Sequence, residues 1–223
     1  MEKHLSEEAL NQFRNIRYTI DLHQWLTNLL GKDPSVQNRL RILKWLGHEV
    51  LQAGNSNDYP QNKQFIPFVL NQLSTLSTNC KEVDLPLFIE ELSSIQEQLM
   101  FALNRFIYIN DSISLEIYQI TDSTDVNLTD NIPDIKKGDT VFYLHLLSLR
   151  SKERLKKMGF NVSSLHLEKS HFLEVLKCAR EYIERDPTIK GVVSISWVFD
   201  PEIAKIQNDS KPFAAFTFLA EDK

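Results

Sequence analysis

The sequence has little glycine, little cysteine and no long apolar run. Only six glycines occur in 223 residues, which argues against a β-rich fold full of tight turns and against glycine-rich phosphate loops. No apolar run approaches the roughly 18 residues of a transmembrane helix, and the N-terminus has no apolar signal core. We therefore expect a cytoplasmic protein without a membrane segment.

The two cysteines are too few and too far apart to define a framework. Cys80 and Cys178 do not form a metal-type pair. Cys178 falls on an apolar helical stripe, which favours a structural thiol over a nucleophile. His166 and His171 are five residues apart, which is not the spacing that places two ligands on one helix face. We expect no metal site.

The charge balance and the missing motifs exclude several classes of function. The net charge is −5, and no broad basic surface of the kind that binds nucleic acid is indicated. The sequence has no GxGxxG, GxxxxGK[ST], HExxH, GxSxG or CxxC motif, so the corresponding mechanisms have no motif support. We expect a small-molecule ligand, a protein partner or self-association, and neither nucleic acid nor a membrane as partner.

The chain has enough apolar material for a core, and its first half is patterned as helices. Apolar residues make up 42% of the chain, with thirteen Phe, six Tyr and three Trp. Residues 1–110 form the expected helical region. Apolar residues recur there at helical spacing, and the expected helices span about 6–31, 33–54, 64–77 and 84–108. Four helices of this length can close a small bundle or a helical cap.

Residues 111–223 have a different residue pattern, with segments typical of strands, and form the expected α/β region. A polar, acidic loop is expected at 121–139. The expected strands span 112–120 (half-buried), 140–147, 191–199 and 212–219. An amphipathic helix is expected at 170–185, with its inward residues Phe172, Leu173, Leu176, Ala179 and Ile183. A strand, a crossover helix and a strand predict a parallel pair, so the predicted class is mixed α/β or α+β, a helical bundle or cap followed by a mixed sheet with a βαβ unit.

The candidate site residues come from the ends of the predicted parallel strands. In open α/β sheets, ligands bind beyond the carboxyl ends of such strands. His145 and Asp200 are the candidate catalytic residues, as base or hydrogen-bond acceptor. Ser148, Ser196 and Trp197 are the candidate substrate-binding residues. The alternatives are a core histidine at 145, a core tryptophan at 197, and an ordinary helix N-cap at Asp200.

A family resemblance covers about 75 residues, from Gly138 to Ile206. The segment GDTVFYLHLL, a long helix and then GVVSISWVFDPEI resemble the C-terminal part of GNAT-like acyltransferase families. Some of these families have a strand that ends in a Ser-Trp-Leu-Leu-Asp-Pro type segment, and a group of bacterial proteins has Ser-Trp-Phe-Tyr-Asp-Pro. The resemblance implies two splayed parallel strands with coenzyme A in the opening. The family's Q/R-x-x-G-x-G/A pyrophosphate loop is missing from 149–160, where the sequence reads LRSKERLKKMGF.

Two functions follow as hypotheses. The first is a GNAT-like small-molecule acyltransferase, or a degenerate relative without catalysis. The second is a non-enzymatic interaction or regulatory protein, suggested by the absence of any catalytic motif and by the acidic loop. The sequence leaves open whether the chain is an enzyme and whether coenzyme A binds.

Overall fold

A computed structural model describes residues 5–14, 21–120, 136–147, 149–160, 162 and 169–193. The chain divides into two compact units, Met1–Arg105 and Phe106–Lys223. We call them the helical unit and the α/β unit. Within the described residues, no helix combines the length and the apolar character needed to cross a membrane.

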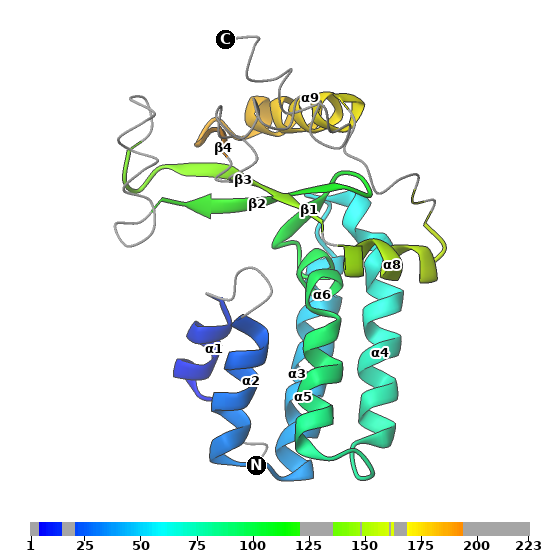
Figure 1. Cartoon of the computed structure of the whole chain (residues 1–223). Coiled ribbons are helices and arrows are strands. Elements are labelled where there is room, and N and C mark those ends of the chain that lie inside the picture. Colours follow the sequence, from blue (N-terminus) through cyan, green and yellow to red (C-terminus); the bar gives the residue numbers. More distant parts are fainter. Residues whose placement is uncertain are drawn as a thin grey trace, which may run out of the picture. The chain divides into compact units, whose positions relative to one another are not determined.

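The helical unit contains several helices (Figure 1), and polar side chains cap the start of some of them. Ser6 caps the first helix by accepting a hydrogen bond from the Ala9 N–H at 3.2 Å. Asp84 caps a later one through the Leu87 N–H at 2.9 Å. The elements are α1 (Glu7–Arg14), α2 (Asp21–Lys32), α3 (Val36–Gly54), the 3₁₀ helix η1 (Pro60–Phe65), α4 (Ile66–Asn79), α5 (Leu85–Ser94) and α6 (Gln96–Ala102).

Aromatic side chains form much of the core of the helical unit. The ring of Phe13 lies 5.0 Å from Trp25 and 4.8 Å from Trp45, centroid to centroid. Phe65 and Phe101 stack at 4.7 Å. Rings at these distances bury large apolar areas and add a favourable contact geometry. The abundance of Phe and Trp in the sequence is therefore used to join α1, α2 and α3, and to join η1 to α6.

The predicted helix over 84–108 is wrong, because the structure interrupts it at Ile95 and ends it at Ala102. Asn104 follows in the left-handed conformation, with φ of 56°, which stops a helix. Its side-chain amide donates to the carbonyl of Ala53 at 3.0 Å. The last residues of the predicted helix form a strand instead. Apolar spacing alone could not show this change.

The α/β unit contains a four-stranded sheet within its described residues, in the order β1-β2-β3-β4. β1 pairs antiparallel with β2, β2 antiparallel with β3, and β3 parallel with β4. The β3–β4 pairing has a register shift between Thr140 and Phe142. The elements are β1 (Phe106–Tyr108), β2 (Ile113–Gln119), β3 (Thr140–Leu146), α8 (Leu149–Lys157), α9 (Lys169–Arg185) and β4 (Ile189–Val193).

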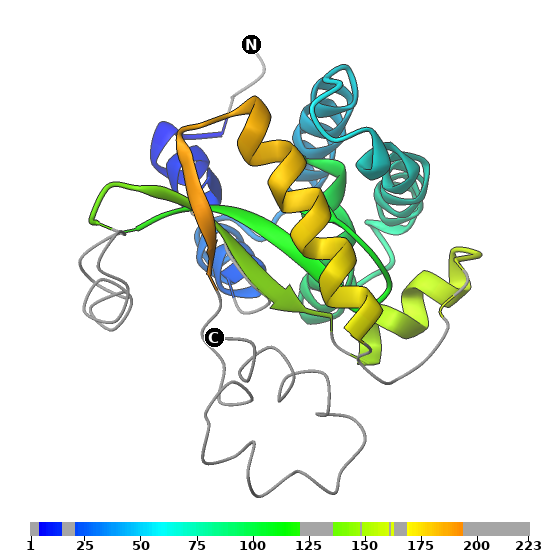
Figure 2. The same ribbon diagram turned by 90° about the horizontal axis from the view of Figure 1, so that it is seen from above.

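Helices α8 and α9 connect the two parallel strands, and α9 lies across one face of the sheet (Figures 1 and 2). The contact includes the rings of Phe142 in β3 and Tyr182 in α9, 6.1 Å apart. The predicted fold class is confirmed: the protein is a mixed α and β protein with an N-terminal helical region and a mixed sheet that contains a βαβ unit. Most of the loop predicted at 121–139, and the strand predicted at 212–219, lie outside the described residues.

The sheet has two chemically different faces, which follow from the strand register. One face, which we call the apolar face, carries Ile113, Leu115, Phe142 and Leu144. The other face, which we call the polar face, carries Ser114, Glu116, Tyr143 and His145.

The predicted half-buried pattern of β2 is wrong. Ile113 to Glu116 are all buried, and the exposed positions are Ile117 and Gln119 on the apolar side. Because both faces are buried at the start of β2, the polar side chains of Ser114 and Glu116 are shielded from water.

The inward face predicted for α9 is partly wrong. Phe172, Val175 and Ala179 are buried, and their steps of three and four form the stripe that faces the protein interior. Leu173 and Leu176 are 52% and 48% exposed. They lie one position away from this stripe, so two leucines that were expected in the core are on the surface.

Candidate functional site

Adjacent strands β2 and β3 bring a histidine and a glutamate together on the polar face. Nε2 of His145 lies 2.8 Å from Oε2 of Glu116, and the two side chains are 13% and 12% exposed. When Glu116 is ionised it can only accept in this bond, so Nε2 then carries the hydrogen, and in the neutral imidazole Nδ1 is the nitrogen that can take a proton. A hydrogen bond of this kind fixes the orientation and tautomer of the imidazole.

Aromatic rings surround this pair. The His145 ring lies 4.9 Å from the Tyr143 ring in the same strand and 5.3 Å from the Phe106 ring in β1, centroid to centroid. The rings exclude water from the pair on these sides. A low local dielectric strengthens the His145–Glu116 interaction relative to the same pair in water.

Ser114 lies directly opposite His145 in the strand register. The side chain of Ser114 is fully buried, and its Oγ has no hydrogen-bond partner among the described residues. A buried hydroxyl without a partner costs about 1–3 kcal/mol. Such a group in a folded protein calls for an explanation, such as a catalytic role or an ordered water molecule.

Together these three residues place a hydroxyl, an imidazole and a carboxylate on one face of two neighbouring strands. A histidine oriented by a carboxylate is one arrangement that supports general-base catalysis. The same residues offer one carboxylate and one imidazole, too few donors for a typical protein-bound metal ion. Within the described residues, no group of three or more metal-ligating side chains is present.

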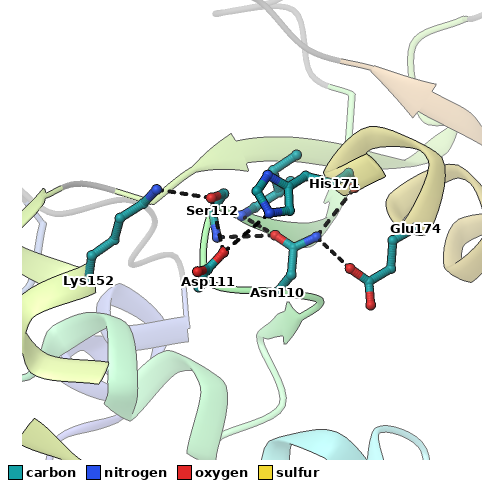
Figure 3. Close-up of polar contacts among 7 residues, drawn as sticks. Asn110, Asp111, Ser112, Lys152, His171 and Glu174 are labelled. Atoms are coloured by element: carbon teal, nitrogen blue, oxygen red, sulfur yellow. Dashed lines mark hydrogen bonds and ion pairs between the residues drawn. The ribbon is translucent and has the colours of Figure 1, made fainter. Parts of the chain in front are cut away.

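A second polar cluster lies at the carboxyl end of β3, where the β1–β2 turn meets α8 and α9 (Figure 3). Its centre is Asn110, whose Oδ1 accepts the backbone N–H groups of Ser112 and Ile113 at 3.1 and 2.9 Å. Its Nδ2 donates to the His171 carbonyl at 3.3 Å and to Oε2 of Glu174 at 2.9 Å. One side-chain amide therefore closes the turn and ties it to the start of α9.

A chain of buried polar groups crosses the same cluster. Nζ of Lys152 in α8 donates to Oγ of Ser112 at 2.9 Å, and Ser112 Oγ donates to Oδ1 of Asp111 at 3.1 Å. Nε2 of His171 faces the same Asp111 oxygen at 3.6 Å. Burial lowers the pKa of Lys152, and the nearby Asp111 carboxylate opposes this shift.

This second cluster holds secondary structure in place. Lys152, Ser112 and Asp111 bond in series, and the Asn110 amide bonds to backbone groups and to Glu174. The Ser112 carbonyl also accepts the Leu147 N–H at 2.8 Å. A fully satisfied buried network gives rigidity to the elements that it joins. We interpret it as the support of the β3 carboxyl end, next to the His145–Glu116 pair.

Of the residues predicted as a site, the structure describes His145 alone. Ser148, Ser196, Trp197 and Asp200 lie outside the described residues. His145 bonds to a carboxylate on the neighbouring strand, an arrangement that the sequence interpretation did not contain.

Sequence reasoning missed Ser114, Glu116 and the Asn110–Ser112 turn. The segment Ser112 to Ile120 was interpreted only as an alternating strand. The available signal was the spacing of Ser114 and Glu116, which are two residues apart in the strand predicted at 112–120 and therefore lie on one face of it. The alternation does not show that these polar residues are buried, so their importance could not be recognised from the pattern.

Comparison of the chain with family models, with curated proteins and with solved structures found no match.

Proposed function

We propose that the chain is an acyl-transfer enzyme that moves an acyl group from a coenzyme A thioester to a small-molecule acceptor, with His145 as general base. The observation that carries the proposal is the 2.8 Å contact between His145 Nε2 and Glu116 Oε2 on adjacent strands. The choice of acyl transfer follows the sequence resemblance to GNAT-like families over residues 138–206.

The proposed role of His145 is to take a proton from the attacking group. The acceptor nitrogen attacks the thioester carbonyl carbon, its proton moves to Nδ1 of His145, and the carbon–sulfur bond breaks. The sulfur leaves as a thiol after it takes a proton. Glu116 holds the Nε2–H and stabilises the positive imidazolium that forms.

The position of His145 supports the proposal. It is the penultimate residue of β3, and β3 is one of two parallel strands. Ligands of open α/β sheets bind at the carboxyl ends of such strands. The Asn110–Ser112 turn and the first turn of α8 are fastened at the same end, which favours a rigid site.

The first experiment measures binding and turnover separately. Millimolar coenzyme A or acetyl-coenzyme A should raise the melting temperature of the full chain, because a ligand that binds only the folded state stabilises it. His145→Gln should retain this shift but lose turnover of acetyl-coenzyme A with a panel of amines by about 10²–10⁴-fold. His23→Gln, at an exposed position of α2, is the matched control. No melting shift with either thioester or free coenzyme A contradicts the proposal.

A second candidate function has its own observation. Leu173 and Leu176 are about half exposed and lie three residues apart on α9, so they form one small apolar patch on the helix surface. A protein whose role is interaction would use such a patch. Light scattering tests it: self-association that disappears in a Leu173→Lys, Leu176→Lys variant supports this candidate, and a monomer at all concentrations argues against self-association.

A further inference from the structure

We propose that Ser114 is a nucleophile, that His145 activates it, and that the acyl group passes through a covalent intermediate on Ser114 Oγ. The inference rests on the proposed acyl transfer and adds a step to it. Glu116, His145 and Ser114 then act as orienting carboxylate, base and nucleophile on the polar face.

The strand register brings the three residues within reach of one another. Ser114 and His145 are direct cross-strand partners, and Glu116 is two residues from Ser114 on the same face. Side chains of direct cross-strand partners have Cβ atoms about 4.5–5.5 Å apart. A rotation of the Ser114 side chain about χ1 can therefore bring Oγ to hydrogen-bond distance of the imidazole. Catalytic hydrogen bonds are often long before a substrate binds.

The unsatisfied hydroxyl is the second observation. Ser114 Oγ is buried without a hydrogen-bond partner among the described residues, although alanine would fill the same site without this penalty. Functional sites are among the places where folded proteins keep a group that breaks a local stability rule, and at Ser114, unlike at Ser93, such a group lies opposite a histidine. By contrast, Ser112 Oγ accepts a hydrogen bond from Lys152 and donates one to Asp111, so its hydroxyl is already used in the second polar cluster.

The chemical step is balanced without any additional reagent. Ser114 Oγ attacks the thioester carbonyl carbon while its proton moves to His145 Nδ1. The carbon–sulfur bond breaks, and the departing sulfur takes that proton. In the second half, an amine or water attacks the Ser114 ester, gives its proton to His145, and Ser114 Oγ leaves with that proton.

The experiment uses two active-site probes, a fluorophosphonate and p-nitrophenyl acetate, with peptide mapping by mass spectrometry. Ser114 is fully buried, so the labelling is expected to be slow, and it is followed over hours. The expected result is one covalent adduct per chain, at Ser114, which decreases at least tenfold in His145→Gln. Ser93 of α5 is the matched control residue, because its Oγ is also buried and has no hydrogen-bond partner in the part of the chain that the structure describes.

Adducts on Ser93 or other serines at the same rate as on Ser114, or no adduct with either probe, would overturn the inference. Ser114→Ala separates the inference from the proposed function. This variant is expected to melt at the same or a higher temperature than the wild type, and to lose the adduct and acyl transfer together. Acyl transfer that needs His145 but persists in Ser114→Ala overturns the nucleophile and leaves the proposed function intact. A Ser114 adduct in a chain that does not bind coenzyme A supports the nucleophile and contradicts the thioester donor.

Discussion

The side-chain amide of Asn110 lies 2.9 Å from the carboxylate of Glu174, which is 64 positions further along the chain. Asn110 belongs to the turn between β1 and β2, and Glu174 to the second turn of α9. The same amide also donates to the His171 carbonyl. The contact therefore fixes the N-terminal part of α9 to a turn that is formed much earlier in the sequence.

Replacement of this amide is expected to destabilise the fold. Asn110→Ala removes the acceptor of two backbone N–H groups and the donor to α9, so the free energy of unfolding should fall by about 2–3 kcal/mol. Urea denaturation measures the change. Asn28→Ala, which removes an exposed contact with Gln24 on α2, is the control and should change stability by less than about 0.5 kcal/mol. Equal effects of the two substitutions would show that Asn110 does not support the turn.

Lys152 should make stability depend on pH. Because its pKa is lowered in the folded state, the unfolded chain binds more protons between the folded pKa and the ordinary value of 10.5. Stability should therefore rise with pH across this interval.

Lys152→Met tests the pH dependence without a large change in volume. The substitution removes the ionisable group, so the stability of the variant does not rise with pH as that of the wild type does. The stability of the variant relative to wild type should therefore decrease as the pH increases towards 10. The readout is the slope, because loss of the Ser112 contact adds a constant destabilisation. Lys63→Met, at a lysine that donates to Oδ1 of the exposed Asn57, serves as control. Parallel pH profiles for wild type and Lys152→Met would contradict the prediction.

Tyr108 should make the stability of the fold decrease, not increase, as the pH rises above 10. Burial raises the pKa of Tyr108 to about 12, with smaller contributions from Asp111 and Glu174. Its contribution to stability is fully present below the ordinary pKa of 10.0 and is lost as the pH rises from 10.0 towards 12. Tyr108→Phe should therefore lose less stability than wild type over this interval. Absorbance of tyrosinate should show one late-titrating tyrosine that is missing in the variant, and an unchanged titration would disprove the assignment.

Cys178 should react slowly with alkylating reagents. Burial, together with Glu181 and Glu174, raises the pKa of Cys178 to about 11 from an ordinary value of 9.0. At pH 8 the thiolate fraction is then about 100-fold smaller than that of an ordinary thiol. Alkylation by iodoacetamide, followed by peptide mass spectrometry, should be slower in the native chain than in urea by at least this factor. Equal alkylation rates in the two states would contradict the burial and the raised pKa of Cys178.

Much of the fold could be predicted because it depends on local patterns. The helix over 170–185 and the strand over 140–147 have strong periodicity, and the structure places α9 and β3 within one residue of these limits. The Ser6 and Asp84 caps are local hydrogen bonds between residues three positions apart. Long-range effects decide the rest: Asn104 and its bond to Ala53 end α6, where periodicity suggested that the helix continues.

The candidate site was less predictable. His145 could be singled out because it lies near the end of a buried strand, but its partner Glu116 is 29 positions away on a separate strand. The pairing register, which no short motif encodes, brings them together. Leu173 and Leu176 show the same limit for burial, since a shift of one position separates the exposed from the buried face of α9.

The register shift between the parallel strands places one extra residue in β4. β3 advances two positions, from Thr140 to Phe142, while β4 advances three, from Ile189 to Val192. As a result, Val193 turns to the side of Tyr118 and Val141, with which it packs, whereas Ile189 pairs with Thr140. A methyl group at Gly191 would meet no atom within 4 Å, so alanine is tolerated there. Deletion of the same residue would restore even spacing and keep Val192 opposite Phe142 and Val193 opposite Tyr143, so this strand is expected to tolerate both the substitution and the loss of its extra residue.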